Sequence, residues 1–198
     1  MNRCKLWVLG LALILPGLAS TASRAAQPQS GPSTLYGVEI IIFRATNVGG
    51  AEDWSAMPSG RGFGSPANRS GQPAIVKLLP ASDYRLSNIE GGLRSSGGWH
   101  PIAHAAWIQT AANWGTHTGF SLADVGINVP ELSGTVYLER APVYIHLGFD
   151  VRYQGAATYT IREMRSVKYN DKQYFDHPAF GIIAQVTPIR HTDAPAPN

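Results

Sequence analysis

Apolar and polar residues alternate without a break over residues 143–153, in the segment VYIHLGFDVRY. Because successive side chains of a strand point to opposite faces of its sheet, one face of this segment is apolar, from Val143 through Phe149 to Tyr153. The other face carries polar side chains and one glycine. We predict a strand that packs Phe149 into a core and turns away from it Tyr144, His146, Gly148, Asp150 and Arg152.

Five other segments predict strands, because they are rich in β-branched and aromatic residues between turn signals. The first, YGVEIIIFR (36–44), is apolar almost throughout, which is typical of a strand buried on both faces. The other four are 99–110, 132–140, 158–169 and 182–189.

Helical signals are few. Leu86, Ile89 and Leu93 recur at helical spacing and predict a short helix within 82–95. We expect Asp176 to cap a second short helix whose first turn contains Pro178.

The segments between these elements are rich in glycine and proline, and two of them are long. Residues 45–80 are predicted to form a long loop that contains Trp54, and 111–131 a second loop that contains Trp114. Strands in the majority with few helices predict an α+β fold: a mostly antiparallel sheet of about six strands, with one or two short helices on one face.

Residues 1–26 have the pattern of a secretory signal peptide: a basic start, a short apolar run and small residues before the end. Cleavage after Ala22, Ala25 or Ala26 fits equally well, and an uncleaved anchor is the alternative. We expect Sec-type export to a bacterial periplasm and no membrane span after cleavage. A flexible leader (27–35), a single domain (36–190) and a disordered tail (191–198) would follow.

The charge balance argues against nucleic-acid binding. The chain has 198 residues, with 16 Lys+Arg against 13 Asp+Glu. Three of the basic residues, Arg3, Lys5 and Arg24, lie in the predicted signal peptide, so the remainder has 13 of each sign. Binding to phosphate backbones needs a basic surplus, which this remainder lacks. The single cysteine, Cys4, also lies in the signal, so no disulfide or thiolate chemistry is expected afterwards.

No common catalytic motif is present, and we expect neither a catalytic role nor a metal or cofactor. His100 and His104 have the spacing of a zinc pair on a helix, but on a strand they would lie about 13 Å apart. We therefore interpret them as structural residues beside Trp99 and Trp107.

Two polar groups each have a structural and a functional interpretation. His146 and Asp150 share a polar face and are expected to meet a neighbour such as Arg162 or Arg165, either as a charge pair worth about 0.2–1 kcal/mol or as a ligand contact. The Asp176-His177-Pro178 segment is either a cap and turn or, with Tyr174, a polar cluster that attracts anions.

Several blocks of the chain, in this order, resemble the CsiV family of periplasmic peptidoglycan-binding proteins. They are YGVEIIIFR (36–44), HAAWIQ (104–109, with Trp107), LSGTVYLER (132–140), YIHL (144–147), REMRS (162–166) and YFDHPAFG (174–181).

The resemblance implies a non-catalytic protein that binds peptidoglycan and supports cell shape. It would act on wall synthesis through an outer-membrane lipoprotein partner of a penicillin-binding synthase. For the ligand contacts, we expect Arg152 and Arg162 to hold stem-peptide carboxylates while Tyr144, Trp54 or Trp114 stacks on sugar.

Two other functions stay open. One is a periplasmic hydrolase that uses His100, His104 or the Asp176-His177 pair. The other is a protein-interaction module with no affinity for glycan.

Overall fold

The computed structural model describes residues 34–47 and 72–189, all of which belong to the compact unit Pro32–Asn198. The predicted signal peptide, the leader up to residue 33, the tail and Trp54 lie outside the described residues.

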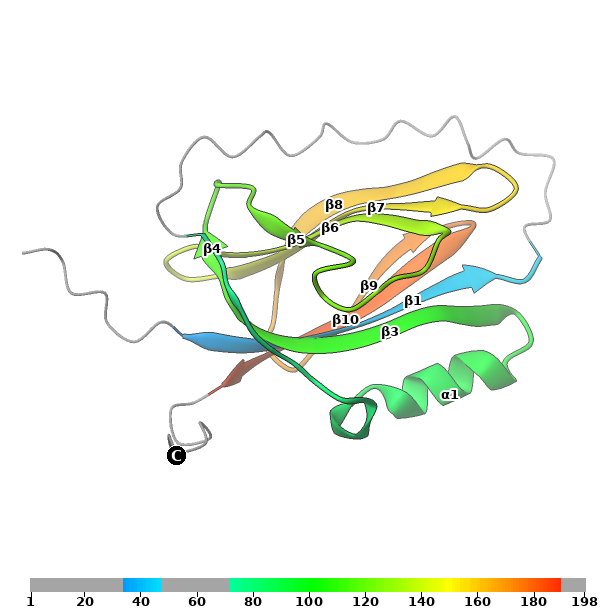
Figure 1. Cartoon of the computed structure of the whole chain (residues 1–198), viewed down its shortest axis with the longest axis horizontal. Coiled ribbons are helices and arrows are strands. Elements are labelled where there is room, and N and C mark those ends of the chain that lie inside the picture. The colour runs from blue at the N-terminus through cyan, green and yellow to red at the C-terminus, as the bar shows by residue number, and fades with distance from the viewer. Residues whose placement is uncertain (1–33, 48–71, 190–198) are drawn as a thin grey trace, which may run out of the picture. The chain divides into compact units, whose positions relative to one another are not determined.

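The described residues form ten strands and one α-helix (Figure 1). The strands are β1 (Leu35–Ala45), β2 (Ile75–Leu78), β3 (Trp99–Thr110), β4 (Ala112–Asn113), β5 (Gly119–Ser121), β6 (Leu132–Arg140), β7 (Ile145–Gln154), β8 (Thr158–Val167), β9 (Lys172–His177) and β10 (Phe180–Ile189).

These strands make two sheets. Sheet A has the order β2-β3-β1-β10-β9, and every neighbouring pair in it is antiparallel. Sheet B has the order β4-β6-β7-β8, with β5 also paired to β6, and only the short β4–β6 pair is parallel. The mostly antiparallel architecture is as expected, but the expectation of about six strands in one sheet was too low.

Of the four strands that the sequence missed, β9 lies in the segment predicted as a second helix, and the other three are short strands in segments predicted as loops. Residues 111–131 contain β4 and β5, and the end of the 45–80 segment contains β2. Each has only two to four residues, too few to show a period of two.

Strand β1 lies at the centre of sheet A, between β3 and β10. Ile40 and Ile42 point into the main core, while Ile41 and Phe43 are buried on the opposite face. The prediction that this strand is buried on both faces is therefore confirmed.

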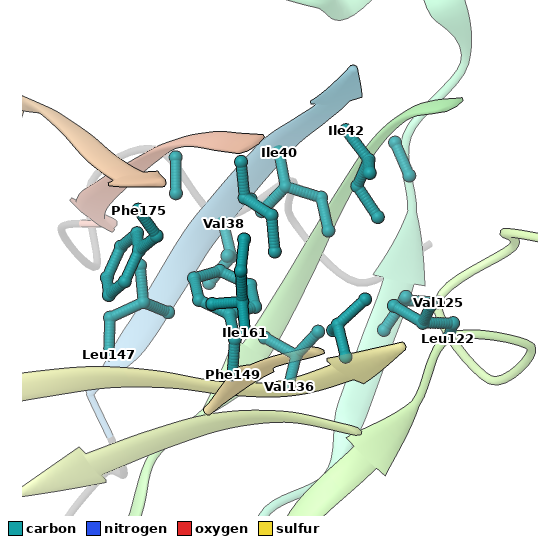
Figure 2. Packing of buried hydrophobic residues seen from close by; sticks show 14 of the residues in the cluster. Val38, Ile40, Ile42, Leu122, Val125, Val136, Leu147, Phe149, Ile161 and Phe175 are labelled. Atoms are coloured by element: carbon teal, nitrogen blue, oxygen red, sulfur yellow. The ribbon is translucent and has the colours of Figure 1, made fainter. Parts of the chain in front are cut away.

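The main core lies between the two sheets (Figure 2). Val136, Leu147 and Phe149 from sheet B share one cluster with Val38 and Ile40 from sheet A. Phe149 is completely buried, as predicted. Its ring packs edge to face against Phe175 of sheet A, with 4.7 Å between the ring centroids. Val143 does not belong to this apolar face, because it lies in the turn before β7 and is 79% exposed.

The helix α1 (Ser87–Ser95) lies along β3, with a 3-10 turn at Ala81–Asp83 before it (Figure 1). Leu86, the residue directly before the helix, is buried. The predicted helix is thus present, but it begins at Ser87 and not near 82.

The predicted second helix was wrong, because residues 172–189 form the β9–β10 hairpin. Asp176 is exposed, lies opposite Gly181 within the ladder, and caps nothing. The capping group is the buried His177, whose Nδ1 accepts a hydrogen bond from the Ala179 N–H at 3.2 Å. Pro178 fixes φ near −65°, which excludes the hairpin turns that need positive φ there, and the histidine contact holds the turn instead.

Candidate functional site

The outward side chains of β6, β7 and β8 form four rows across sheet B, which we call the sheet-B face. The strand register aligns Glu139 with His146 and Ser166, Tyr137 with Gly148 and Met164, Thr135 with Asp150 and Arg162, and Ser133 with Arg152 and Thr160. The polar positions predicted from the alternation of β7 therefore lie together on one surface.

Asp150 and Arg162 are direct cross-strand neighbours and form a two-point ion pair. The Arg162 Nε donates to Asp150 Oδ2 at 3.0 Å, and its Nη2 to Oδ1 at 3.3 Å. Both side chains are mostly buried, with 17% and 23% exposed. This pair is the cross-strand contact that the sequence predicted. It also leaves the Arg162 charge largely balanced within the protein.

An aromatic group lies at one end of the sheet-B face. The Trp114 ring packs on the His146 ring at 3.8 Å between centroids, with an angle of 30°. The Trp114 backbone N–H donates to the Arg140 carbonyl, which fixes the loop to the end of β6. Trp114 is 50% exposed, and Tyr144, two residues before His146, is 62% exposed. This end of the face thus presents large aromatic side chains to solvent.

Glu139 supports the loop that carries Trp114. It is completely buried, and its Oε2 accepts the Gly115 N–H at 2.8 Å. Its Oε1 lies 3.6 Å from His117 Nδ1 and has no hydrogen-bond partner. Glu139 therefore holds the loop of Trp114 from below, through Gly115 and beside His117.

The ionisation of two neighbouring groups is shifted by burial. Burial lowers the pKa of His146, and nearby Glu139 opposes this only in part. Burial also raises the pKa of Tyr137, which lies beside the Asp150–Arg162 pair. The sheet-B face therefore carries a neutral imidazole and a neutral phenol near pH 7, with its charge on the carboxylates and arginines.

Arg152 is the exposed cation of this face, and it has no ion-pair partner among residues 34–47 and 72–189. Arg165, the alternative neighbour for Asp150, points the other way. Its guanidinium lies 3.9 Å from the Phe175 ring centroid and donates to the Tyr174 carbonyl. Of the predicted ligand residues, His146, Asp150, Arg152, Arg162 and Trp114 thus share one face, and Tyr144 lies exposed in the turn at its end.

Two of the residues predicted to be structural, Trp107 and His177, are buried and have identifiable partners, whereas His100 and Asp176 are exposed. Trp107 is completely buried between the sheets, and its Nε1–H donates to Gln109 Oε1. His177 packs against Tyr159 and Phe180, and burial lowers its pKa.

His104 has a role that the sequence did not reveal. It lies on the face of sheet A turned away from sheet B, where Nε2 meets Glu39 Oε1 and Nδ1 meets Glu90 Oε2, both at 2.8 Å. These hydrogen bonds outweigh burial and raise its pKa, so the doubly bonded ring is an imidazolium. We call Glu39, His104 and Glu90 the clamp, because they tie α1 to β1 and β3.

The residues of the hydrolase alternative do not converge. His100 and His177 lie in one row of sheet A but are separated by two strands, a distance of about 14 Å. Both ring nitrogens of His104 already meet carboxylates. The described part of the chain contains no group of three or more side chains that could hold a metal ion.

Comparisons with protein-family models, with curated proteins and with solved structures gave no match to this chain. Within the described ranges, no helix is long and apolar enough to cross a membrane.

Sequence reasoning missed Glu139 and His117 as members of the site. The position of Glu139 could have been predicted, because Ser133, Thr135, Tyr137 and Glu139 alternate with apolar residues in the same way as the polar side of β7. His117 lies in a loop with positive φ, and no periodic signal marks its position.

Proposed function

We propose that this protein is a non-catalytic periplasmic peptidoglycan-binding protein, and that it binds glycan strands on the sheet-B face. The observation that supports the proposal is that exposed aromatic rings, Trp114 and Tyr144, lie at one end of the face that also carries the Asp150–Arg162 pair and the exposed Arg152.

The two parts of this face suit two parts of the polymer. Aromatic rings pack on the apolar faces of sugars, and Trp114 is held in place from below by His146. Arginine recognises carboxylates through parallel hydrogen bonds, and the stem peptides carry carboxylates. Arg152 is the better candidate for this contact, because Arg162 is already paired with Asp150.

The biological part of the proposal rests on the resemblance to the CsiV family. According to this part of the proposal, the protein supports cell-wall synthesis and cell shape, and its partner is an outer-membrane lipoprotein activator of a penicillin-binding synthase.

The test is co-sedimentation of the purified protein with isolated sacculi. We expect the wild type to pellet, and Trp114→Ala and Tyr144→Ala each to weaken retention by about tenfold, equivalent to about 1.4 kcal/mol. Arg152→Gln should do the same. The matched control is Tyr174→Ala, since Tyr174 is 46% exposed but belongs to sheet A.

Three results would count against the proposal. Unchanged retention of a Trp114→Ala/Tyr144→Ala double variant would remove the sheet-B face as the binding surface. Wild-type protein that stays in the supernatant would favour an interaction module, and release of soluble muropeptides would favour a hydrolase.

A further inference from the structure

A cavity of about 240 Å³ opens on sheet A, on the face turned away from sheet B. It is separate from the sheet-B face, so it has no part in the proposed glycan contacts. Its size is below the roughly 300–1,000 Å³ of sites for drug-sized ligands, and its occupant therefore has to be small.

Most of the cavity wall is apolar. Ala106 and Ile108 of β3 line it, with Leu79 from the segment after β2 and Ile189 from the end of β10. Gly37 of β1 also lines it and contributes no side chain. An occupant with a branched aliphatic group would bury that group against these residues.

Three charged residues line the same cavity: Glu39, whose oxygens are bonded to His104 and to backbone N–H groups, and the oppositely charged Asp83 and Arg85. The Arg85 Nη1 donates to the Thr187 hydroxyl at 3.3 Å, and no carboxylate of the described residues lies within ion-pair distance of the guanidinium. A guanidinium has five N–H donors, so Arg85 keeps donors for an anionic group. Asp83 Oδ1 accepts from the adjacent Ser82 hydroxyl, and its carboxylate also has acceptor capacity left.

The segment that carries these charges is held in position. Glu39 Oε2 accepts the Arg85 N–H at 2.9 Å and Glu39 Oε1 accepts the Leu86 N–H at 2.8 Å. Glu39 is itself bonded to His104, so the clamp fixes the backbone at the cavity edge. A site whose polar groups are already fixed loses less entropy when it binds a ligand.

We propose that this cavity binds a small zwitterion of the amino-acid class with a branched apolar side chain. Arg85 contacts its carboxylate, Asp83 contacts its ammonium group, and the aliphatic part lies against Ala106 and Ile108.

The test uses three probes of matched shape: leucine, 4-methylpentanoate, which lacks the ammonium group, and 3-methylbutylamine, which lacks the carboxylate. Each is titrated into the protein at millimolar concentration, and amide chemical shifts of Ala106 and Ile108 report binding. Leucine is expected to bind about tenfold more tightly than either single-charge probe.

Charge variants assign the two contacts. Arg85→Gln should weaken leucine and 4-methylpentanoate and leave the amine unchanged, whereas Asp83→Asn should weaken leucine and the amine only. Lys168→Gln is the matched control, because Lys168 is an exposed cation outside the cavity.

A further variant tests the cavity itself. A Cβ at Gly37 would lie 3.8 Å from the Thr187 carbonyl oxygen, an ordinary contact, so Gly37→Ala should fold and reduce affinity for all three probes. Equal affinity for all three probes, no shift at Ala106 or Ile108, or no effect of Arg85→Gln would each overturn the proposal. None of these results depends on retention by sacculi.

Discussion

At the scale of single residues, Phe149 of sheet B packs its ring directly against Phe175 of sheet A. Phe149→Ala removes a completely buried ring and leaves a cavity, so we expect it to cost about 3–5 kcal/mol. Urea unfolding measures this. Val143→Ala is the control from the same alternating segment, and since Val143 is exposed, its effect should stay within about 0.5 kcal/mol. Equal effects of the two variants would mean that β7 faces the other way.

Gly134 is required by the close approach of β6 to β7. Its φ is +137°, and a Cβ there would lie 2.1 Å from the Asp150 carbonyl oxygen. Gly134→Ala should therefore destabilise the protein by more than about 1 kcal/mol. Thermal unfolding of the variant and of the wild type measures this loss of stability.

A second glycine variant, in α1, should change the stability of the protein in the opposite direction. Gly91 lies in α1 with nothing within 4 Å of a Cβ added there. Gly91→Ala should stabilise by about 0.5–1 kcal/mol, because alanine loses less backbone entropy in a helix. Destabilisation by Gly91→Ala, or tolerance of Gly134→Ala, would contradict this reasoning.

The sequence predicted part of the candidate site at this scale. The sequence predicted a cross-strand neighbour of Asp150 such as Arg162 or Arg165, and the strand register makes Arg162 that neighbour. It could not show that the two charges largely satisfy each other, because that depends on side-chain geometry. Nor could it bring Trp114 onto His146, since the turn that places Trp114 has no periodic pattern.

At the scale of elements, the clamp makes the attachment of α1 depend on pH. The hydrogen bonds from His104 and from the Leu86 and Arg85 N–H groups outweigh burial and lower the pKa of Glu39. The hydrogen bond from His104, with help from Arg94, lowers that of Glu90. The pKa of His104 is raised.

These shifts set a window of stability. The contribution of His104 is complete below about pH 6.5, its unperturbed pKa, and is lost as the pH rises through its raised folded value. Those of Glu39 and Glu90 are complete above about pH 4.5 and are lost on acidification. The clamp should be most stabilising between these limits.

His104→Gln tests this assignment. We expect the variant to be less stable between pH 4.5 and 6.5 and to lose the decline in stability above that range, as measured by urea midpoints at several pH values. His100→Gln, an exposed histidine in the same strand, should keep the wild-type profile. A decline that persists in His104→Gln would assign it to another group.

Element prediction failed where side-chain contacts decide between helix and turn. The pattern Asp-His-Pro matches a helix start, yet His177 turns into the core and accepts the Ala179 N–H. The long strands β3 and β6 were predicted with their observed bounds, because each has a sustained pattern and a clear end.

At the scale of the whole described region, Arg165 connects the edges of the two sheets. It belongs to β8 of sheet B, but it donates to the carbonyl of Tyr174 and covers the ring of Phe175, both in β9 of sheet A. Arg165→Gln should cost about 1–2 kcal/mol through the lost charge-assisted hydrogen bond and cation–π contact.

Hydrogen exchange locates this effect. We expect faster exchange in β9 of Arg165→Gln, and little change in β6, which lies away from that edge. Lys168→Gln, one residue past the end of β8, serves as the charge control. An unchanged β9 would show that the two edges are held by apolar packing alone.

The division into two sheets was beyond the sequence. Only Ala111 separates β3 of sheet A from β4 of sheet B, so the change of sheet leaves no loop that a pattern could mark. The apolar faces were predictable, but not which of them face one another.

The position of β1 in the centre of sheet A has a consequence for the order of events during synthesis. Its first residue, Leu35, pairs with Ile189, at the other end of the described chain. Sheet A therefore cannot close until residue 189 has emerged from the ribosome, and until then YGVEIIIFR remains an apolar segment without its partner β10. Long-range pairing of this kind slows folding and exposes the nascent chain to aggregation. Under the proposed periplasmic function, in which export precedes folding, the same delay keeps the polypeptide unfolded for transport until β10 is available.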